Sequence, residues 1–192
     1  MITPYSARTA ITQAYSVDLQ GTSDFTPMVS GGRSSSLDKI ASRYEAGIVI
    51  AAVERQERLR HWLLWSYGPA FFASLRSNQV GAAMLVAELC GIEWEGMRDA
   101  VRQRTEVLIY VHMENYRALA VTGSRKYRKP AHIARQVQRL TGGQLSIDLS
   151  NYQRDFGYLA DMVQAVCEEL DKKSLGPVAK VLPHLSALQG VA

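Results

Sequence analysis

The sequence predicts an all-α fold, a compact helical bundle with a helix-turn-helix-like DNA-binding unit near its C-terminus and a flexible N-terminal arm. Apolar residues recur every three or four positions over most of the chain, whereas no run alternates with a period of two. Gly and Pro separate the periodic stretches. With 192 residues, 47% hydrophobic and 21% charged, the chain is long and apolar enough to bury a core.

Residues 1–37 form the expected flexible arm. They are rich in Ser, Thr, Gly and Pro and end in a Ser- and Gly-rich run, which offers too little apolar surface to offset the entropy of ordering. A short helix near Ala7–Tyr15 is the one element expected there. No positively charged start precedes an apolar block and no apolar run is long enough to span a bilayer. We therefore expect a cytoplasmic location and no membrane partner.

Residues 38–122 form the predicted helical core. Ser36 or Asp38 caps its first helix, an aromatic-rich stretch at 59–67 stops at Gly68-Pro69, and a further helix lies near 79–90. The apolar stripe expected on the first helix consists of Ile40, Tyr44, Ile48 and Ala51. The stripe expected on the helix near 79–90 consists of Val80, Ala83, Met84 and Ala87. A long helix at about 96–120 follows and ends at Gly123.

Residues 123–192 form the predicted basic helix-turn-helix-like region with the C-terminal helices. Pro130 suits the first turn of a helix over 131–140 because its missing N–H would be unpaired there. After a connector, Asp148 or Ser150 caps a longer helix. The seam expected along that helix consists of Phe156, Leu159, Val163, Val166 and Leu170. Gly176-Pro177 is expected to divide it from a last helix.

The positive charge of the chain is concentrated between Gly123 and Arg139. This segment holds six Lys or Arg residues, one His and no acid, while the whole chain carries a net charge of +4. Such a segment attracts a polyanion, since each neutralised phosphate releases counterions. It is attached to a predicted helix, a Gly-containing turn and a second helix, the layout of helix-turn-helix readers, although the connector 141–149 is longer than a minimal turn.

The start of the second helix adds side chains that suit base edges, because Asn and Gln pair with adenine and Arg with guanine. The sequence therefore predicts double-stranded DNA as the partner. The predicted DNA-binding residues are Arg125, Lys126, Arg128, Lys129, His132, Arg135, Gln136, Arg139, Asn151, Gln153 and Arg154.

Short motifs in both halves of the chain carry a family resemblance. The C-terminal ones are Tyr152-x-Arg154, Leu159-x-Asp161 and Cys167. Those before the basic segment are Val107-Leu108, Glu114-x-x-Arg117, Ala120 and Gly123-x-Arg125, with Ala46-Gly47 in an earlier helix. Together they cover about half of the chain in short stretches, and they resemble the Q-type late-gene antiterminators of lambdoid bacteriophages.

The resemblance implies a protein that binds DNA at a phage late promoter and engages host RNA polymerase, including its sigma factor, at a promoter-proximal pause. It then travels with the polymerase past terminators in the host bacterial cytoplasm. Many family members carry paired CxxC motifs that form a zinc-binding insertion after the central helix. Here the corresponding Ser124–Lys129 lacks cysteine, so zinc is not implied and no cofactor is expected.

Catalytic chemistry finds little support in the sequence. Cys90 and Cys167 sit in separate apolar patterns, and the four histidines are scattered without metal-ligand spacing. Gly142-Gly143 lacks the Lys-Ser/Thr of a phosphate-binding loop. We therefore expect neither an enzyme nor a metal site.

Three other functions remain open. The same helix pair would serve a repressor or activator, or the DNA-recognition subunit of a packaging machine. Alternatively, the basic face binds an acidic protein, with the aromatic cluster at Trp62, Trp65, Tyr67, Phe71 and Phe72 acting as core or as docking surface.

Overall fold

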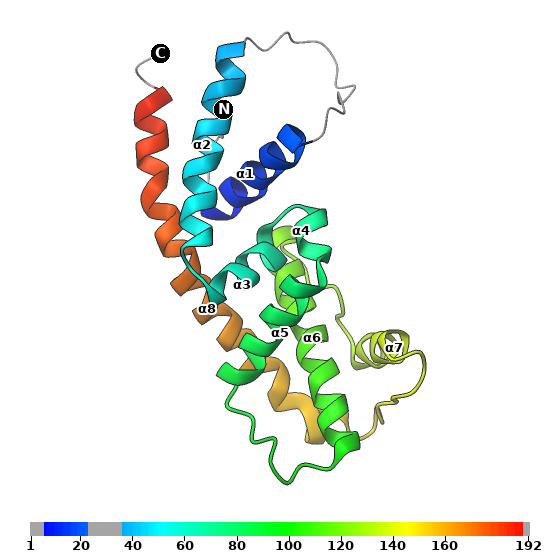
Figure 1. Cartoon of the computed structure of the whole chain (residues 1–192). Coiled ribbons are helices and arrows are strands. Elements are labelled where there is room, and N and C mark those ends of the chain that lie inside the picture. The colour runs from blue at the N-terminus through cyan, green and yellow to red at the C-terminus, as the bar shows by residue number, and fades with distance from the viewer. Residues whose placement is uncertain (1–5, 23–35, 190–192) are drawn as a thin grey trace. The chain divides into compact units, whose positions relative to one another are not determined.

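The computed structural model describes the backbone at residues 6–22 and 36–189, with side chains at 6–19 and 40–185. These residues form α-helices joined by short loops and contain no strand, so the predicted all-α class is confirmed (Figure 1). The helices are α1 (Ala7–Thr22), α2 (Ser36–Glu54), α3 (Arg58–Tyr67), α4 (Ala70–Ser74), α5 (Arg76–Leu89), α6 (Asp99–Thr122), α7 (Pro130–Leu140) and α8 (Tyr152–Gln189).

The chain divides into two compact units that differ from the three predicted segments. The first contains the described residues of Met1–Ala82 and Leu170–Ala192, and the second is Ala83–Glu169. The boundary predicted after residue 37 falls within α2, and the one predicted after residue 122 falls inside the second unit. Helices α5 and α8 contribute residues to both units.

The first part of the predicted arm is a packed helix. In α1, Ala10, Ile11, Ala14 and Tyr15 are buried, and the helix packs on α2 and α3. The prediction of a flexible arm is therefore wrong for Ala7–Thr22, because apolar side chains at helical spacing supply a buried face despite the polar composition. The expected short helix is present and extends to Thr22. Residues 1–5 and 23–35 of the predicted arm lie outside the described residues.

A buried carboxylate links three helices of the first unit. Asp171 of α8 accepts hydrogen bonds from Trp62 Nε1 (2.9 Å) and Tyr67 Oη of α3, and from Arg8 Nη2 of α1 (2.9 Å). Trp62, Trp65 and Tyr67 are themselves buried, whereas Phe71 is 56% exposed. The aromatic cluster of α3 is therefore core, and Phe71 is not part of it.

The prediction is wrong for two apolar stripes, whose largest residues are exposed and do not face the core. On α2, Ile40 and Tyr44 are each 64% exposed, and the buried side chains include Ala46, Val49 and Val53. On α5, Val80 and Met84 are exposed, and the buried apolar side chains are Ala82, Leu85 and Val86. Both helices carry apolar residues on more than one face, so periodicity alone does not tell which face is buried. Packing against neighbouring helices determines it.

The predicted break at Gly176-Pro177 is absent. Helix α8 runs without interruption through Pro177 and Pro183, both of which are exposed. Their neighbours Ser174, Val178 and Leu185 are buried. The prediction is wrong because the buried face of the helix holds it together although each proline removes one backbone donor.

The second unit is built around α6. Leu108, Ile109 and Met113 of α6 are buried, as are Leu159 and Val163 of the predicted α8 seam. The expected end of α6 is confirmed, because Gly123 adopts a left-handed conformation (φ 72°) and donates to the carbonyl of Leu119.

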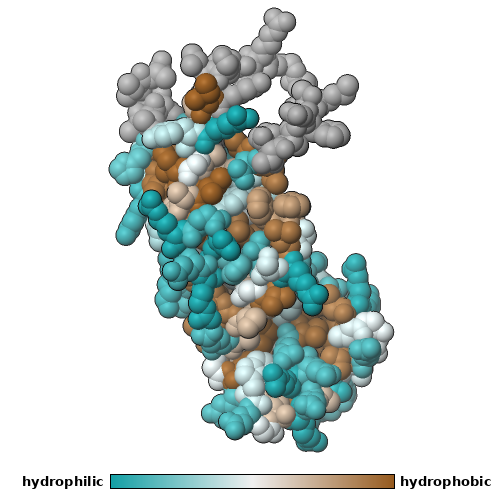
Figure 2. Space-filling view, viewed as in Figure 1, coloured by the Kyte–Doolittle hydropathy of each residue, from teal (hydrophilic) through white to brown (hydrophobic). Residues whose placement is uncertain are grey.

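The surface mixes apolar and polar residues. On the face drawn in Figure 2, brown apolar residues are interspersed with teal polar ones. None of the helices in the described part of the chain combines the length and hydropathy needed to cross a bilayer.

Candidate nucleic-acid interface

The basic segment folds as the loop Gly123–Lys129 followed by α7. Pro130 stands in the first turn of α7, as predicted. Ile133, Ala134 and Val137 are buried, and α7 packs on α6. Since residues three, four and seven apart share a helix face, this burial leaves the polar stripe at positions 132, 135, 136 and 139 on an outer face of α7.

That stripe and the loop line an open groove of about 340 Å³. We call it the cationic groove, and its lining residues are Lys126, Tyr127, His132, Arg135, Gln136 and Arg139. No carboxylate is among them. The structure thus brings together five of the predicted DNA-binding residues and adds Tyr127, which sequence reasoning missed because a tyrosine in a loop has no distinctive pattern.

Four cations at this site carry uncompensated charge. Arg128, Lys129, Arg135 and Arg139 are all exposed, and within the described residues none of their side chains makes a hydrogen bond or ion pair. Their charges are therefore available to an external anion.

The other two cations have partners inside the second unit. Arg125 Nη2 donates to Gln164 Oε1 of α8 (2.9 Å), a neutral partner that leaves its charge in place. Lys126 Nζ lies 2.9 Å from Glu114 Oε1 of α6. Burial lowers the pKa of Lys126, but contacts with Tyr127 and Glu114 outweigh it, so the pKa is raised and the ammonium stays charged.

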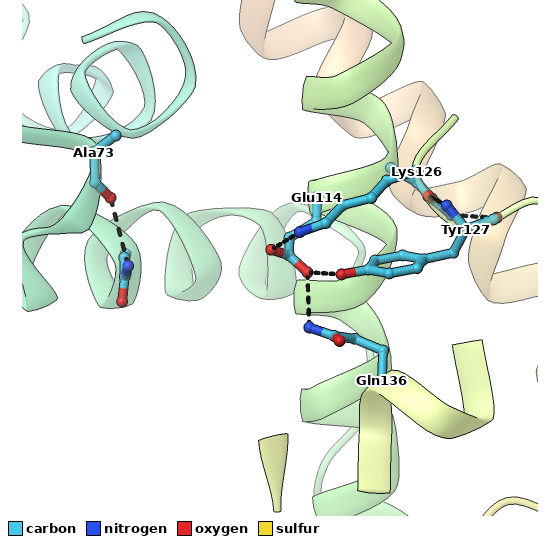
Figure 3. A network of polar contacts seen from close by, with 7 residues as sticks. Ala73, Glu114, Lys126, Tyr127 and Gln136 are labelled. Atoms are coloured by element: carbon cyan, nitrogen blue, oxygen red, sulfur yellow. Dashed lines mark hydrogen bonds and ion pairs between the residues drawn. The ribbon is translucent and has the colours of Figure 1, made fainter. Parts of the chain in front are cut away.

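Glu114 and Asn115 of α6 hold the loop in place. The Tyr127 N–H donates to Asn115 Oδ1 (2.6 Å), and Asn115 Nδ2 donates to the Tyr127 carbonyl (3.1 Å). Glu114 Oε2 accepts from Tyr127 Oη (2.8 Å) and, more weakly, from Gln136 Nε2 at 3.4 Å (Figure 3). These contacts fix the position of the loop relative to α6 and so shape the groove. Sequence reasoning did not identify Glu114 or Asn115 as site residues.

The predicted base-reading residues at the start of α8 do not line the groove. Asn151 Nδ2 donates to Asp148 Oδ2 (2.6 Å), and Arg154 Nε pairs with Asp155 Oδ1 (2.7 Å). Gln153 is exposed, and its side-chain amide folds back over Gly157, with Nε2 only 2.7 Å from the position that a Cβ would take there. Hydrogen bonds from Ser150 and Asn151 lower the pKa of Asp148, which therefore adds negative charge to this end of the helix. The helix-turn-helix geometry stays a prediction.

A buried polar pair joins α6 to α8 within the second unit. His112 Nε2 lies 3.2 Å from Tyr152 Oη, and both side chains are buried. Burial, reinforced by the charge of Arg125 and opposed by that of Asp161, lowers the pKa of His112 to about 4. The imidazole is therefore neutral at pH 7.

Metal-ligating and thiol groups are dispersed. Within residues 6–22 and 36–189 no three His, Cys, Asp or Glu side chains stand close enough to share a metal ion. Cys167 is buried and Cys90 half-buried, and neither forms a disulfide. Burial raises the pKa of Cys90 to about 11.

Comparison with known proteins adds no information about this groove. The likeness to Q-type antiterminators, which rests on short motifs, stays a prediction. No family model, curated protein or solved structure matches the chain.

Proposed function

We propose that this protein binds double-stranded DNA through the cationic groove and the loop beside it. The observation that supports this most directly is the set of exposed cations without internal partners, namely Arg128, Lys129, Arg135 and Arg139. Arg135 and Arg139 line a groove that has no acid among its lining residues, and Arg128 and Lys129 lie in the loop directly before α7. A phosphate backbone supplies the charge that such a surface attracts, with the release of counterions.

Helix α7 has dimensions that suit the major groove. Its 11 residues span about 16 Å, and the major groove, about 12 Å wide, admits an α-helix. Arg135, Gln136 and Arg139 carry the donors and acceptors that distinguish guanine and adenine edges. Arg128 and Lys129, in the loop before α7, are assigned to phosphates, which position the protein without reading sequence. Asn151, Gln153 and Arg154 stay as a second set for base contacts.

On the strength of the family resemblance, we propose antitermination as the biological role. The DNA-bound protein would engage host RNA polymerase with its sigma factor at a promoter-proximal pause and accompany it past terminators. Transcription in vitro through a terminator, with purified bacterial polymerase, tests this. Read-through should rise when the protein is added, and unchanged read-through despite DNA binding would favour a repressor, an activator or a packaging subunit.

Assembly distinguishes those rivals. Light scattering with and without DNA would reveal a dimer for a repressor on a palindrome and a large ring for a packaging subunit. If the partner is instead an acidic protein, DNA binding should be weak and indifferent to sequence.

Replacing Arg128, Lys129 and Arg135 together with alanine tests the DNA site. We expect weaker binding and a plot of log affinity against log salt that is shallower by about 2, since Arg128 and Lys129 are assigned to phosphates and each lost phosphate contact removes about 0.9. A fluorescence-anisotropy titration of labelled duplex at several salt concentrations measures both.

A matched control removes the same charge elsewhere. Arg55, Lys173 and Lys180 are also exposed, and their triple alanine variant should keep the wild-type salt dependence. Equal losses in the two variants would show that net charge, not the cationic groove, drives binding.

A further inference from the structure

We propose that Glu114 is a specificity-determining residue of the cationic groove, acting by neutralising Lys126 and by fixing the amide orientation of Gln136. This inference rests on the proposed DNA binding. Glu114 does not itself line the groove, but it contacts three side chains that do (Figure 3).

The two carboxylate oxygens of Glu114 bind different side chains of the groove. Oε1 pairs with the Lys126 ammonium at 2.9 Å, with the Glu114 side chain 18% exposed and that of Lys126 49% exposed. A partly buried pair of this kind is screened less than one in open water. Lys126 therefore adds little net charge to the groove, and Arg135 and Arg139 are left as its uncompensated cations.

The second oxygen, Oε2, orients Gln136. A carboxylate only accepts hydrogen bonds, so the Nε2 of Gln136 must face it, at 3.4 Å. One Nε2 proton and the Oε1 acceptor then remain for a ligand. An amide held this way presents its donor and acceptor in one order, which is what bidentate pairing with adenine requires.

The fold of the loop does not depend on Glu114 alone. Asn115 binds both backbone groups of Tyr127, at 2.6 and 3.1 Å, so the loop keeps an anchor on α6 when the carboxylate is removed. This separates an electrostatic role of Glu114 from a purely structural one.

Charge and orientation affect binding differently. A free lysine strengthens attraction to every duplex equally, because phosphates carry no sequence information. A freely rotating amide accepts either orientation and discriminates less. Removal of the Glu114 charge should therefore raise non-specific affinity and reduce the ratio of specific to non-specific binding.

The test is the isosteric Glu114→Gln variant in the full chain. Two probes are used, a duplex selected by the wild-type protein from a random library and a shuffled duplex of the same composition. We expect about 5-fold tighter binding of the shuffled duplex, with a salt slope steeper by about 0.9. The ratio of the affinity for the selected duplex to the affinity for the shuffled duplex should fall about tenfold.

Further variants assign each effect to its side chain. Glu114→Gln combined with Lys126→Gln should restore the wild-type slope while the ratio stays low. Gln136→Ala should lower the ratio without steepening the slope. Lys126→Gln alone, an exposed change that does not depend on how Glu114→Gln folds, should leave the slope at its wild-type value.

Several outcomes overturn the proposal. Glu114→Gln with unchanged slope and ratio would do so, as would weaker binding of both duplexes with an unchanged circular dichroism spectrum. A slope reduced by about 0.9 in Lys126→Gln would show that Lys126 already contacts a phosphate. If the wild-type protein binds neither duplex, the proposed function itself fails, and this inference fails with it.

Discussion

The buried imidazole of His112 makes the second unit sensitive to acid. Its pKa is lowered to about 4 in the fold, against about 6.5 in an unfolded chain. Between these values the unfolded chain binds more protons than the folded one. The contribution of His112 to the free energy of unfolding is therefore fully present above about pH 6.5 and is lost as the pH falls towards 4.

Replacing His112 with glutamine should remove this acid sensitivity. Between pH 7.5 and pH 5 the wild-type protein should lose about 2 kcal/mol more free energy of unfolding than the variant, which has no imidazole to protonate. Urea denaturation at the two pH values measures this, and the carboxylates common to both proteins cancel in the comparison. Equal losses would mean that His112 is already accessible to protons in the folded state.

The carboxylate of Asp171 is the acceptor on which the polar core of the first unit depends. Asp171→Ala leaves the buried Trp62 N–H and Tyr67 hydroxyl without this acceptor. We expect a loss of about 3 kcal/mol in the free energy of unfolding, since an unsatisfied buried donor costs about 1–3 kcal/mol. The neighbouring exposed change Lys173→Ala should stay within about 0.5 kcal/mol of the wild type. Similar denaturation midpoints for the two variants would contradict this assignment.

At the scale of elements, α8 tolerates two prolines because they face solvent while its buried side holds the packing. Pro177→Ala restores the missing backbone donor at an exposed position. The free energy of unfolding should rise by about 2 kcal/mol, the helix-interior penalty of proline less the entropy it removes from the unfolded chain. Thermal unfolding followed by circular dichroism at 222 nm would detect the higher Tm, and a lower Tm would indicate that the helix ends at Gly176.

For the whole molecule, the decisive property is where the charge lies. The chain carries +4 in total, yet six cations lie between Gly123 and Arg139. Arg128 and Lys129 are the two cations assigned to phosphates, so log affinity should fall with log salt with a slope of about −2, a loss on the order of 10-fold between 50 and 200 mM salt. Binding by fluorescence anisotropy across that range measures it, and a slope near zero would exclude the phosphate contacts.

Much of the candidate site could be predicted from the sequence because its signals are local. One short segment contains Pro130, the buried Ile133 and Val137 at helical spacing, and the run of cations. Within such a segment periodicity and composition are informative. The arm was wrong for Ala7–Thr22 for the opposite reason. Its buried face combines alanines with Ile11 and Tyr15, and their contribution depends on partners in α2 and α3.

By itself, the sequence determined that the chain is helical, where α6 ends and α7 begins, and that one segment carries an excess of positive charge. Only the tertiary structure decided which of those charges are free. Glu114 reaches Lys126 because α6 and the loop are packed together, whereas Arg128 and Lys129 find no acid nearby in the described part of the chain. Ion pairs and hydrogen bonds need atoms within about 3–4 Å, and packing between helices, not local sequence, brings side chains to such distances.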